Sequence, residues 1–446
     1  MARKVFNNCR EDASAGGPPK RVSALNTTTD SKPPIDQDRL WNDHMALAAI
    51  TDPGKPWTRR SFSPRFLEGR AWLREQFLAA GMTVRLDAGA NLIARLEGTV
   101  KGAPPIMLGS HSDTVPSGGR FDGISGILTA LEAVRALQAS NYPFRHPIEI
   151  VDFLAEEPSE YGLSCVGSRA MVGELDAKML TYTNAQGETL ADAIIRVGGD
   201  PAAIPHMEKP VIAGYLELHI EQGVVLERNK LDLGLVTGIA GITRVEIALK
   251  GAADHAGSTL MRYRRDASLP AAELLLLVDR EARAFAGRNE GHFVATVGVL
   301  EISPNAANVV PGGARMIIDI RAEKVALVDE FVALLDREST AIAGRLNVDR
   351  EGFAILSQNP PAPCDAHLRD LLGRSADKLG YSTTTLASGA GHDAAFISHI
   401  GPSAMLFIPS RDGKSHCPEE WSEPEQLAVG AATLFETIRL LDGQNI

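Results

Sequence analysis

The stretch that most constrains the fold is an apolar run followed by a glycine-rich loop and a helical pattern. Residues 105–108 are Pro-Ile-Met-Leu, residues 109–126 read GSHSDTVPSGGRFDGISG, and apolar residues then recur with helical spacing. This order predicts a strand, a loop and a helix. The loop holds two good metal ligands, His111 and Asp122, and Asp113 follows at a spacing that lets it hold the His111 imidazole. A metal site here needs further ligands from elsewhere in the chain.

The patterns around this loop predict an α/β catalytic domain with a mostly parallel mixed sheet flanked by helices. Strand 105–109, helix 123–139 and strand 148–154 form a β–α–β unit, which implies parallel strands with helices on the sheet faces. The remaining elements expected in its first part are a helical region over 38–81, a hairpin of 82–87 and 91–96, and strand 214–220.

The pattern changes near Gly238, where an inserted domain is expected. The order of strands and helices over 242–355 is β-α-β-β-α-β, which is the ferredoxin-like α+β pattern. Its expected elements are strands 242–250, 293–301, 314–321 and 347–355 and helices 266–285 and 324–344. From Ala366 a helix, a short strand, helix 393–399 and the apolar strand 404–408 resume the α/β alternation.

We therefore expect three parts in the chain. Residues 1–36 form a disordered leader, because they are rich in polar residues and proline and have no apolar stretch of signal-peptide type. Residues 37–238 and 357–446 form the catalytic domain, and residues 239–356 form the insertion between them.

Composition excludes several classes of partner and compartment. A net charge of −11 and only 5% aromatic residues argue against nucleic acid or an anionic membrane as the main partner. No apolar run approaches the roughly 18 residues that a membrane span needs. The four cysteines are widely spaced and form no C-x-x-C pair, so we expect a cytoplasmic protein without a disulfide framework.

Several predicted strands end in side chains that can bind metals. His111, Glu156 with Glu157, His219 and His416 lie at or beyond the ends of strands 105–109, 148–154, 214–220 and 404–408. Ligands in open α/β sheets bind beyond the carboxyl ends of the strands. With Asp122, these residues give three imidazoles and three carboxylates at one edge, which suits two metals that share a bridging carboxylate. The alternative, unrelated solvated or structural residues, requires several strands to deliver ligands to one edge by chance.

These stretches resemble the dinuclear zinc amidohydrolases of the aminoacylase/carboxypeptidase clan. Within that clan the resemblance is closest to the N-carbamoyl-L-amino-acid hydrolases, β-ureidopropionases and allantoate amidohydrolases. It covers the chain from about Asp38 to its end, and it is specific for the family but only weakly specific for the substrate. The matched stretches are GSHSDTVPSGGRFDG at 109–123, ELHIEQG at 217–223, DHAGST at 254–259, SPNAANVVPG at 303–312, DIR at 319–321, GAGHDA at 389–394 and SHCPEE at 415–420.

The resemblance implies a role for each metal-competent residue. Asp122 would bridge two divalent metal ions, which could be zinc, manganese, cobalt or nickel. His111 and His219 would complete one metal site, and Glu157 and His416 would complete the other. Glu156 would be the general base for a metal-bridged water. Asp113 would support His111 from behind.

The resemblance also implies substrate contacts and a homodimer. His255 would reach the substrate in the partner subunit's active site and help to stabilise the oxyanion, so the insertion would be a dimerisation or lid domain. Asn308 and Arg321 would bind the substrate carboxylate, because a guanidinium fork suits a carboxylate. Gln222 would contact the ureido or amide group, and Gly391 lies in a tight loop that borders the pocket. A bland loop histidine and an ordinary surface arginine are the alternatives for His255 and Arg321.

One segment departs from the family pattern. Carbamoylase-type members usually continue the glutamate pair as Glu-Glu-Gly-x-Arg-Phe, whereas this chain has Pro158 after the pair and Glu160-Tyr161 in place of Arg-Phe. A positive charge expected near the metal edge thus becomes negative, and we expect an altered pocket. Cys165 has no neighbouring base that the sequence identifies, and Cys417 is interpreted as a packing residue.

The sequence therefore predicts a metal-dependent amidohydrolase that cleaves a linear C–N bond. The preferred substrate is the ureido group of an N-carbamoyl amino acid or a related ureido carboxylate. The alternatives are an N-acyl amino acid amidase or dipeptidase of the same clan, and a catalytically inactive binding homologue. The expected partners are a small substrate with a carboxylate and a second copy of the chain, with no nucleic acid and no membrane.

Overall fold

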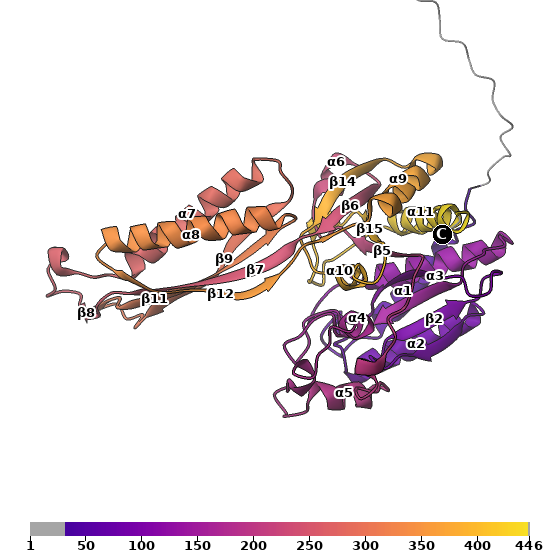
Figure 1. Cartoon of the computed structure of the whole chain (residues 1–446), viewed down its shortest axis with the longest axis horizontal. Coiled ribbons are helices and arrows are strands. Elements are labelled where there is room, and N and C mark those ends of the chain that lie inside the picture. The colour runs from indigo at the N-terminus through magenta and orange to yellow at the C-terminus, as the bar shows by residue number, and fades with distance from the viewer. Residues whose placement is uncertain (1–31, 445–446) are drawn as a thin grey trace, which may run out of the picture. The chain divides into compact units, whose positions relative to one another are not determined.

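The computed structural model describes residues 32–444 (Figure 1). Residues 1–31 of the predicted leader lie outside this range, so its predicted disorder is not addressed by the structure. In the described part, a large mixed sheet and a separate antiparallel sheet each have their own hydrophobic cluster. None of the helices between residues 32 and 444 combines the length and the apolar character that crossing a membrane requires.

The large sheet is parallel at its centre and antiparallel towards its edges. Strands β4, β3, β5 and β15 are consecutive neighbours and pair in parallel, whereas β1, β2 and β13 pair in antiparallel fashion. β6 is antiparallel to β15 and parallel to β14. In spatial order the strands found within residues 32–444 are β1 (Thr83–Leu86), β2 (Leu92–Leu96), β4 (Ile148–Phe153), β3 (Ile106–His111), β5 (Gly214–Ile220), β15 (Ser403–Ile408), β6 (Leu233–Ile239) and β13 (Ala362–Pro363), with β14 (Thr383–Ser388) against β6.

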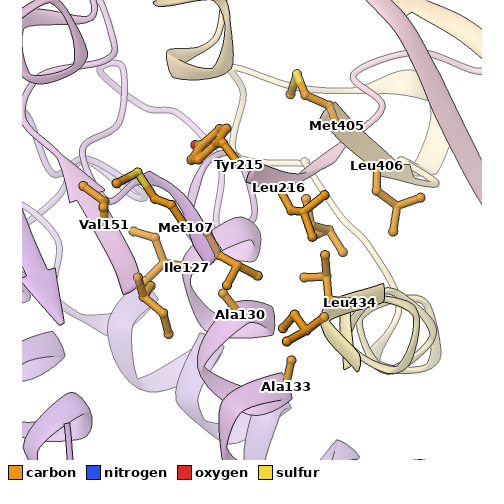
Figure 2. Packing of buried hydrophobic residues seen from close by; sticks show 14 of the residues in the cluster. Met107, Ile127, Ala130, Ala133, Val151, Tyr215, Leu216, Met405, Leu406 and Leu434 are labelled. Carbon is orange, nitrogen blue, oxygen red and sulfur yellow. The ribbon is translucent and has the colours of Figure 1, made fainter. Parts of the chain in front are cut away.

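The central strands are buried along their whole length. β3, β4, β5 and β15 contain only buried residues, as expected for parallel strands that are covered on both faces. Helices α3 (Ile124–Ala139) and α11 (Pro424–Asp442) pack against each other and against these strands. Figure 2 shows this core, in which Ala130 and Ala133 of α3 lie beside Leu434 of α11. The small alanine side chains let the two helices approach closely.

Several of the other helices begin at a side-chain cap. Asp36, Ser63 and Asp365 accept hydrogen bonds from the backbone in the first turns of α1, α2 and α9. The remaining helices outside the antiparallel sheet are α1 (Gln37–Ala49), α2 (Pro64–Ala79), α4 (Val166–Val172), α5 (Leu190–Arg196), α6 (Val225–Asn229), α9 (Ala366–Leu379) and α10 (Asp393–Ile397), and the 3₁₀ turns are η1 (Met179–Thr181), η2 (Ile204–His206), η3 (Met261–Tyr263) and η4 (Arg411–Gly413).

The second sheet has the predicted ferredoxin-like order. Its strands lie in the order β12 (Asp349–Asn359), β7 (Gly241–Lys250), β11 (Gly313–Ala322) and β9 (Phe293–Ser303), and every neighbouring pair is antiparallel. Helices α7 (Ser268–Ala286) and α8 (Val325–Arg345) pack on it. Buried residues alternate along β11 because the helices supply the hydrophobic cluster on one face only. A short pair, β8 (Asp254–His255) with β10 (Val309–Val310), completes this part.

The predicted fold class is confirmed, with several local differences. The helical region expected over 38–81 is interrupted at 50–63, because Pro53, Gly54 and Pro56 break the pattern between α1 and α2. The sequence did not predict strands β6, β8, β10 and β13 or helices α4, α5, α6 and α11. The chain passes to the second sheet between Ile239 and Gly241 and returns between Asn359 and Ala362, and the predicted domain boundaries close to these points stay predictions.

Packing of α3 on β5 generates a stability prediction. A Cβ atom at Gly126 in α3 would lie 2.5 Å from the backbone oxygen of Leu218 in β5. Gly126→Ala would therefore push the backbone of α3 away from the backbone of β5. We expect the free energy of unfolding in urea to fall by ~1–3 kcal/mol. Gly344→Ala in α8 is the matched control, because a Cβ there meets nothing within 4 Å. That variant should stay within ~1 kcal/mol of the parent, and equal effects of both variants would contradict the packing argument.

Candidate metal centre

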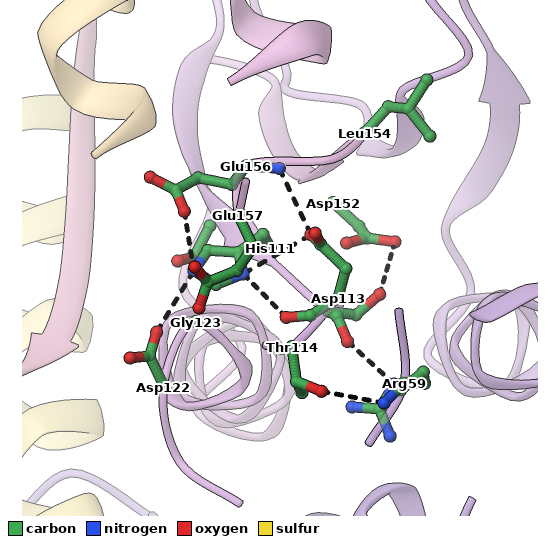
Figure 3. A network of polar contacts seen from close by, with 12 residues as sticks. Arg59, His111, Asp113, Thr114, Asp122, Gly123, Asp152, Leu154, Glu156 and Glu157 are labelled. Atoms are coloured by element: carbon green, nitrogen blue, oxygen red, sulfur yellow. Dashed lines mark hydrogen bonds and ion pairs between the residues drawn. The ribbon is translucent and has the colours of Figure 1, made fainter. Parts of the chain in front are cut away.

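The parallel strands bring the predicted ligands to one edge of the large sheet. His111 is the last residue of β3, and His219 lies one residue before the end of β5. Glu156 and Glu157 follow β4, and His416 lies in the segment after β15. Because β4, β3, β5 and β15 are parallel neighbours, their carboxyl ends meet at the same edge. Figure 3 shows His111 with Asp122, Glu156 and Glu157 around it.

Asp122 belongs to two groups of potential ligand atoms. Its Oδ1 lies 3.4 Å from His111 Nε2 and 3.3 Å from His219 Nε2. Its Oδ2 lies 3.3 Å from His416 Nε2, which is also 3.3 Å from Glu157 Oε1. Within each group the ligand atoms lie within 4.8 Å of one another. Each oxygen of Asp122 thus faces a different group, which is what a bridging carboxylate requires.

The buried imidazoles present the nitrogen that a metal ligand needs. His111 Nδ1 donates to the backbone oxygen of Asp113 at 3.0 Å, and His219 Nδ1 donates to the backbone oxygen of Ile220 at 2.9 Å. The Nε2 atom of each ring then faces Asp122, and its lone pair becomes available to a metal ion once the ring is neutral. The donor set of imidazole nitrogen and carboxylate oxygen fits zinc, manganese, cobalt or nickel.

Asp113 lies where the sequence predicts it, but it contacts His111 mainly through its backbone. The carboxylate Oδ1 is 3.6 Å from His111 Nδ1, farther than the backbone oxygen, and it accepts a hydrogen bond from the Glu156 backbone N–H at 3.3 Å. Asp113 therefore connects the end of β3 to the segment that follows β4.

Charge pairing in the cluster shifts the pKa values of its members. Hydrogen bonds to Asp122 and Glu157 raise the pKa of His416 to about 11. Burial alone would raise the pKa of Asp122, but the surrounding imidazoles of His219, His111 and His416 hold it well below its usual range. Burial alone would lower the pKa of His111, but nearby carboxylates raise it. Without a bound cation, protons on the imidazoles therefore balance the buried carboxylates.

Glu156 lies beside the two groups without belonging to either. Its Oε2 is 3.6 Å from His111 Nε2, and its side chain is buried. Burial raises its pKa well above the usual range, and the carboxylates of Asp393, Glu157 and Asp113 raise it further, against the effect of His111. A carboxylate that binds protons readily and lies next to potential metal ligands can act as a general base.

Glu420 is a residue of the centre that sequence reasoning missed. Its Oε1 accepts hydrogen bonds from the backbone N–H groups of Phe121 at 2.8 Å and Asp122 at 3.0 Å, and its Oε2 accepts one from Ser415 Oγ at 2.9 Å. A Cβ at Gly119 would lie 1.8 Å from Glu420 Oε1, so glycine leaves room for this carboxylate. Glu420 thus joins the Asp122 loop to the His416 segment. It stands in the matched stretch SHCPEE, but nothing in that stretch indicates burial.

Gln222, which the family resemblance predicts to contact the substrate, contacts Asp122 in the structure. Its Nε2 donates to Asp122 Oδ2 at 2.7 Å and to Ser415 Oγ at 3.1 Å. Its backbone lies in the left-handed region, with φ of 56°, and its N–H donates to Ser410 Oγ at 3.0 Å. The amide therefore lies at the edge of the centre.

The structure does not bring Asn308 and Arg321 together within one chain. Arg321, near one end of β11, donates from Nη1 to the backbone oxygen of Gly389 at 2.8 Å. Asn308 lies beyond the other end, where its backbone oxygen accepts from Ala256 N at 2.9 Å, next to His255 in β8. Arg321 lies eight positions after Gly313, the first residue of β11, which is a span of about 26 Å at ~3.3 Å per residue. One small substrate can contact both side chains only if they come from two subunits.

The loop after β14 lies beside the centre. Gly391 is exposed, and the next residue, His392, is buried with its ring 4.6 Å from the ring of His219. His392 Nε2 forms a hydrogen bond of 2.7 Å with Ser388 Oγ, and burial lowers its pKa well below the usual range. His392 is thus a neutral packing partner of His219.

The residues that depart from the family pattern are split between solvent and a separate core. Glu160 is exposed. Tyr161 is buried, donates to Glu188 Oε2 at 2.6 Å and packs edge-on against Phe62 at 5.3 Å. Tyr161 therefore belongs to a third hydrophobic cluster rather than to the metal-ligand groups. The expected change in the pocket stays a prediction.

Comparisons with known proteins cover nearly the whole chain. The model of peptidase family M20/M25/M40 matches residues 107–440. The N-carbamoyl-L-amino acid amidohydrolase of Geobacillus stearothermophilus is 37% identical over 407 residues, covering 91% of this chain and 98% of the relative. The ureidoglycolate hydrolase of Arabidopsis thaliana is 34% identical over 416 residues, covering 91% and 87%. A crystal structure of an amidase of the hydantoinase/carbamoylase family from Burkholderia multivorans superposes with a TM-score of 0.85 at 31% identity, covering 92% of this chain and 99% of that one.

The charge balance of the centre generates a prediction about metal binding. With a pKa of about 11, His416 is protonated at pH 7 in the metal-free protein, and it must lose this proton to become a ligand. Adding Zn²⁺ to metal-free protein in a weakly buffered solution should therefore release protons. His416→Ala should release at least about one proton fewer per chain. His399→Ala, an exposed histidine paired with Glu174, is the control and should match the parent. Equal release from all three proteins would contradict the assignment of His416.

Proposed function

The chain belongs to peptidase family M20/M25/M40 and is a hydrolase that acts on C–N bonds, and from this premise we propose that it hydrolyses the ureido group of an N-carbamoyl amino acid or a related ureido carboxylate. The family membership confirms the resemblance inferred from the motifs. The observation that carries the proposal is the pair of ligand groups that share Asp122, with the buried Glu156 beside them. The names of the two relatives, which specify N-carbamoyl amino acids and ureidoglycolate, support this class of substrate.

In this proposal the two groups hold two divalent ions. His111 and His219 with Asp122 would hold one ion, and Glu157 and His416 with Asp122 would hold the other. Bound ions of this kind would polarise the scissile carbonyl and lower the pKa of water. Glu420 and Ser415 would fix Asp122 in its bridging orientation through the hydrogen bonds that join the two loops.

Glu156 moves the proton in the proposed reaction. Its Oε2, the oxygen nearer to His111, accepts a proton from the attacking water and passes it to the leaving nitrogen. Because Glu156 is outside both ligand groups, it is free to bind and release this proton. The products from an N-carbamoyl substrate are ammonia, carbon dioxide and an amine.

Substrate binding in the proposal involves residues of two subunits. Arg321 contacts the loop before Gly391 and would bind the substrate carboxylate beside the metal edge. Asn308 and His255 would come from the partner subunit, which is supported by their separation from Arg321 along β11. A homodimer and a cytoplasmic location stay predictions.

The substrate class is tested with a panel of N-carbamoyl, ureido and N-acyl acids and the metal-reconstituted enzyme. We expect ammonia and amine to appear together from the carbamoyl and ureido acids, because hydrolysis of the ureido group frees both nitrogens. Turnover of N-acyl acids alone, with amine but no ammonia, would favour the amidase or dipeptidase alternative. No turnover of any member at full metal occupancy would favour an inactive binding homologue.

The role of Glu156 is tested with Glu156→Gln. The amide keeps the size of the side chain but cannot accept the proton, so we expect kcat to fall by ~10²–10⁴-fold while metal content stays the same. Glu160→Gln, an exposed glutamate of the same segment, is the matched control and should keep parental kcat. An unchanged kcat in Glu156→Gln would rule out Glu156 as the base.

A further inference from the structure

A thiol lies against one oxygen of the Glu156 carboxylate. Cys165 Sγ is 3.5 Å from Glu156 Oε1, whereas the other oxygen, Oε2, faces His111 Nε2 at 3.6 Å. Both side chains are buried, with 6% of Cys165 and 8% of Glu156 exposed. Within residues 32–444, Cys165 is the side chain that donates a hydrogen bond to this carboxylate. The two oxygens of Glu156 thus have different neighbours on different sides.

The backbone places the thiol there. After a loop that follows β4, the chain returns antiparallel to itself: Cys165 N donates to Glu156 O at 2.9 Å, Val166 N to Ala155 O at 3.1 Å, and Gly167 N to Leu154 O at 2.8 Å. Ala155 and Cys165 both have left-handed backbone, with φ of 51° and 55°. These successive hydrogen bonds fix Cys165 opposite Glu156, so the contact does not depend on a side-chain rotamer alone.

Gly167 allows segments 154–156 and 165–167 to lie close together. A Cβ at Gly167 would lie 1.9 Å from Asn91 Oδ1 and 2.4 Å from Leu154 N, so a side chain there would push the returning segment away. Asn91 in turn donates to Gly167 O at 3.0 Å and accepts from Leu154 N at 3.0 Å. Gly167 and Asn91 thus hold the segment that contains Cys165 against the segment that contains Glu156.

The chemistry of Cys165 suits a donor rather than a nucleophile or a metal ligand. Burial raises the pKa of its thiol well above the usual range, and the neighbouring carboxylates of Glu156 and Asp393 raise it further. It therefore keeps its proton, and an S–H group is a weak hydrogen-bond donor. A weak donor can orient a carboxylate with little stabilisation of the charged form, which leaves the carboxylate able to accept a proton.

We propose that Cys165 is a positioning residue for Glu156. Its S–H donates to Oε1 and thereby holds Oε2 towards the side of the carboxylate on which His111 and Asp122 lie. The inference rests on the proposed function, because it assigns Cys165 an effect on the proton transfer by Glu156. Loss of an outer partner of this kind costs activity by misplacing the reacting group, without removing any contact to the substrate.

The kinetic test compares Cys165→Ala and Cys165→Ser with the parent enzyme. We expect kcat of Cys165→Ala to fall by ~10–100-fold with KM and metal content unchanged. Cys165→Ser should recover part of that loss, because a hydroxyl can donate from the same position. Cys364→Ala is the matched control, since Cys364 is also buried but follows β13 in a different part of the large sheet, and it should keep parental kcat. A parental kcat in Cys165→Ala, or a Cys165→Ser variant no better than Cys165→Ala, would overturn the proposal.

A spectroscopic test reads the contact itself and does not need turnover. The Raman difference between the parent protein and Cys165→Ala isolates the S–H stretching band of Cys165. The same difference measured in a Glu156→Ala background isolates that band without the carboxylate, which leaves the backbone oxygen of residue 156, at the longer distance of 3.8 Å from Sγ, as the remaining acceptor. We expect the band to move towards the frequency of a free thiol when Glu156 is absent, and an unmoved band would overturn the hydrogen bond. Because this result is independent of substrate, failure of the ureido-hydrolase proposal and failure of this inference are distinguishable.

Discussion

The buried carboxylate of Asp122 is the constraint on which the rest of the centre depends. It lies in a loop and has imidazoles on both oxygens, while its backbone N–H is held by Glu420. Further buried carboxylates lie against Asp122 or against its imidazole partners: Glu156, Glu157 and Glu420. Buried negative charge is costly unless it is paired. The protons on the imidazoles satisfy part of this demand, and divalent cations between the same side chains would satisfy it more fully.

The large sheet and the loops that leave it together hold the buried charges around Asp122 in place, and several of these loops contain strained backbone. The parallel strands β4, β3, β5 and β15 fix the positions at which their loops leave the sheet. The loops then turn sharply, and Ala155, Cys165, Gln222 and His416 all have left-handed backbone next to or within the centre. Such conformations cost of order 1–3 kcal/mol each in non-glycine residues and persist only where the surroundings hold them. The stability of the buried sheet and its helices thus supports a centre whose loops are individually unfavourable.

The antiparallel sheet carries three predicted substrate-binding residues, Arg321, Asn308 and His255, that cannot all reach the metal centre of their own chain. Arg321 lies at the end of β11 that contacts Gly389, whereas Asn308 and His255 lie beyond the other end. A strand is too stiff and too long to fold these groups onto one small molecule. A second subunit is the simplest source of the missing contacts, which is why oligomeric state and substrate binding are linked in the proposed function.

The sequence by itself determined the fold class and the identity of the residues that gather around Asp122. Strand patterns are local, and ligands at strand ends follow from the parallel order of the sheet, so His111, Glu157, His219 and His416 could be predicted together. β6 was missed because two glycines, Gly234 and Gly238, interrupt the apolar pattern of Leu233–Ile239. The separation of Asn308 from Arg321 follows from the length of β11. Only the tertiary structure decided that Glu420 holds the Asp122 loop, that Gln222 donates to Asp122 and that Cys165 donates to Glu156. The first two contacts join loops distant in the sequence, and all three depend on the path that each loop takes after leaving the sheet, which no periodic pattern in the sequence encodes.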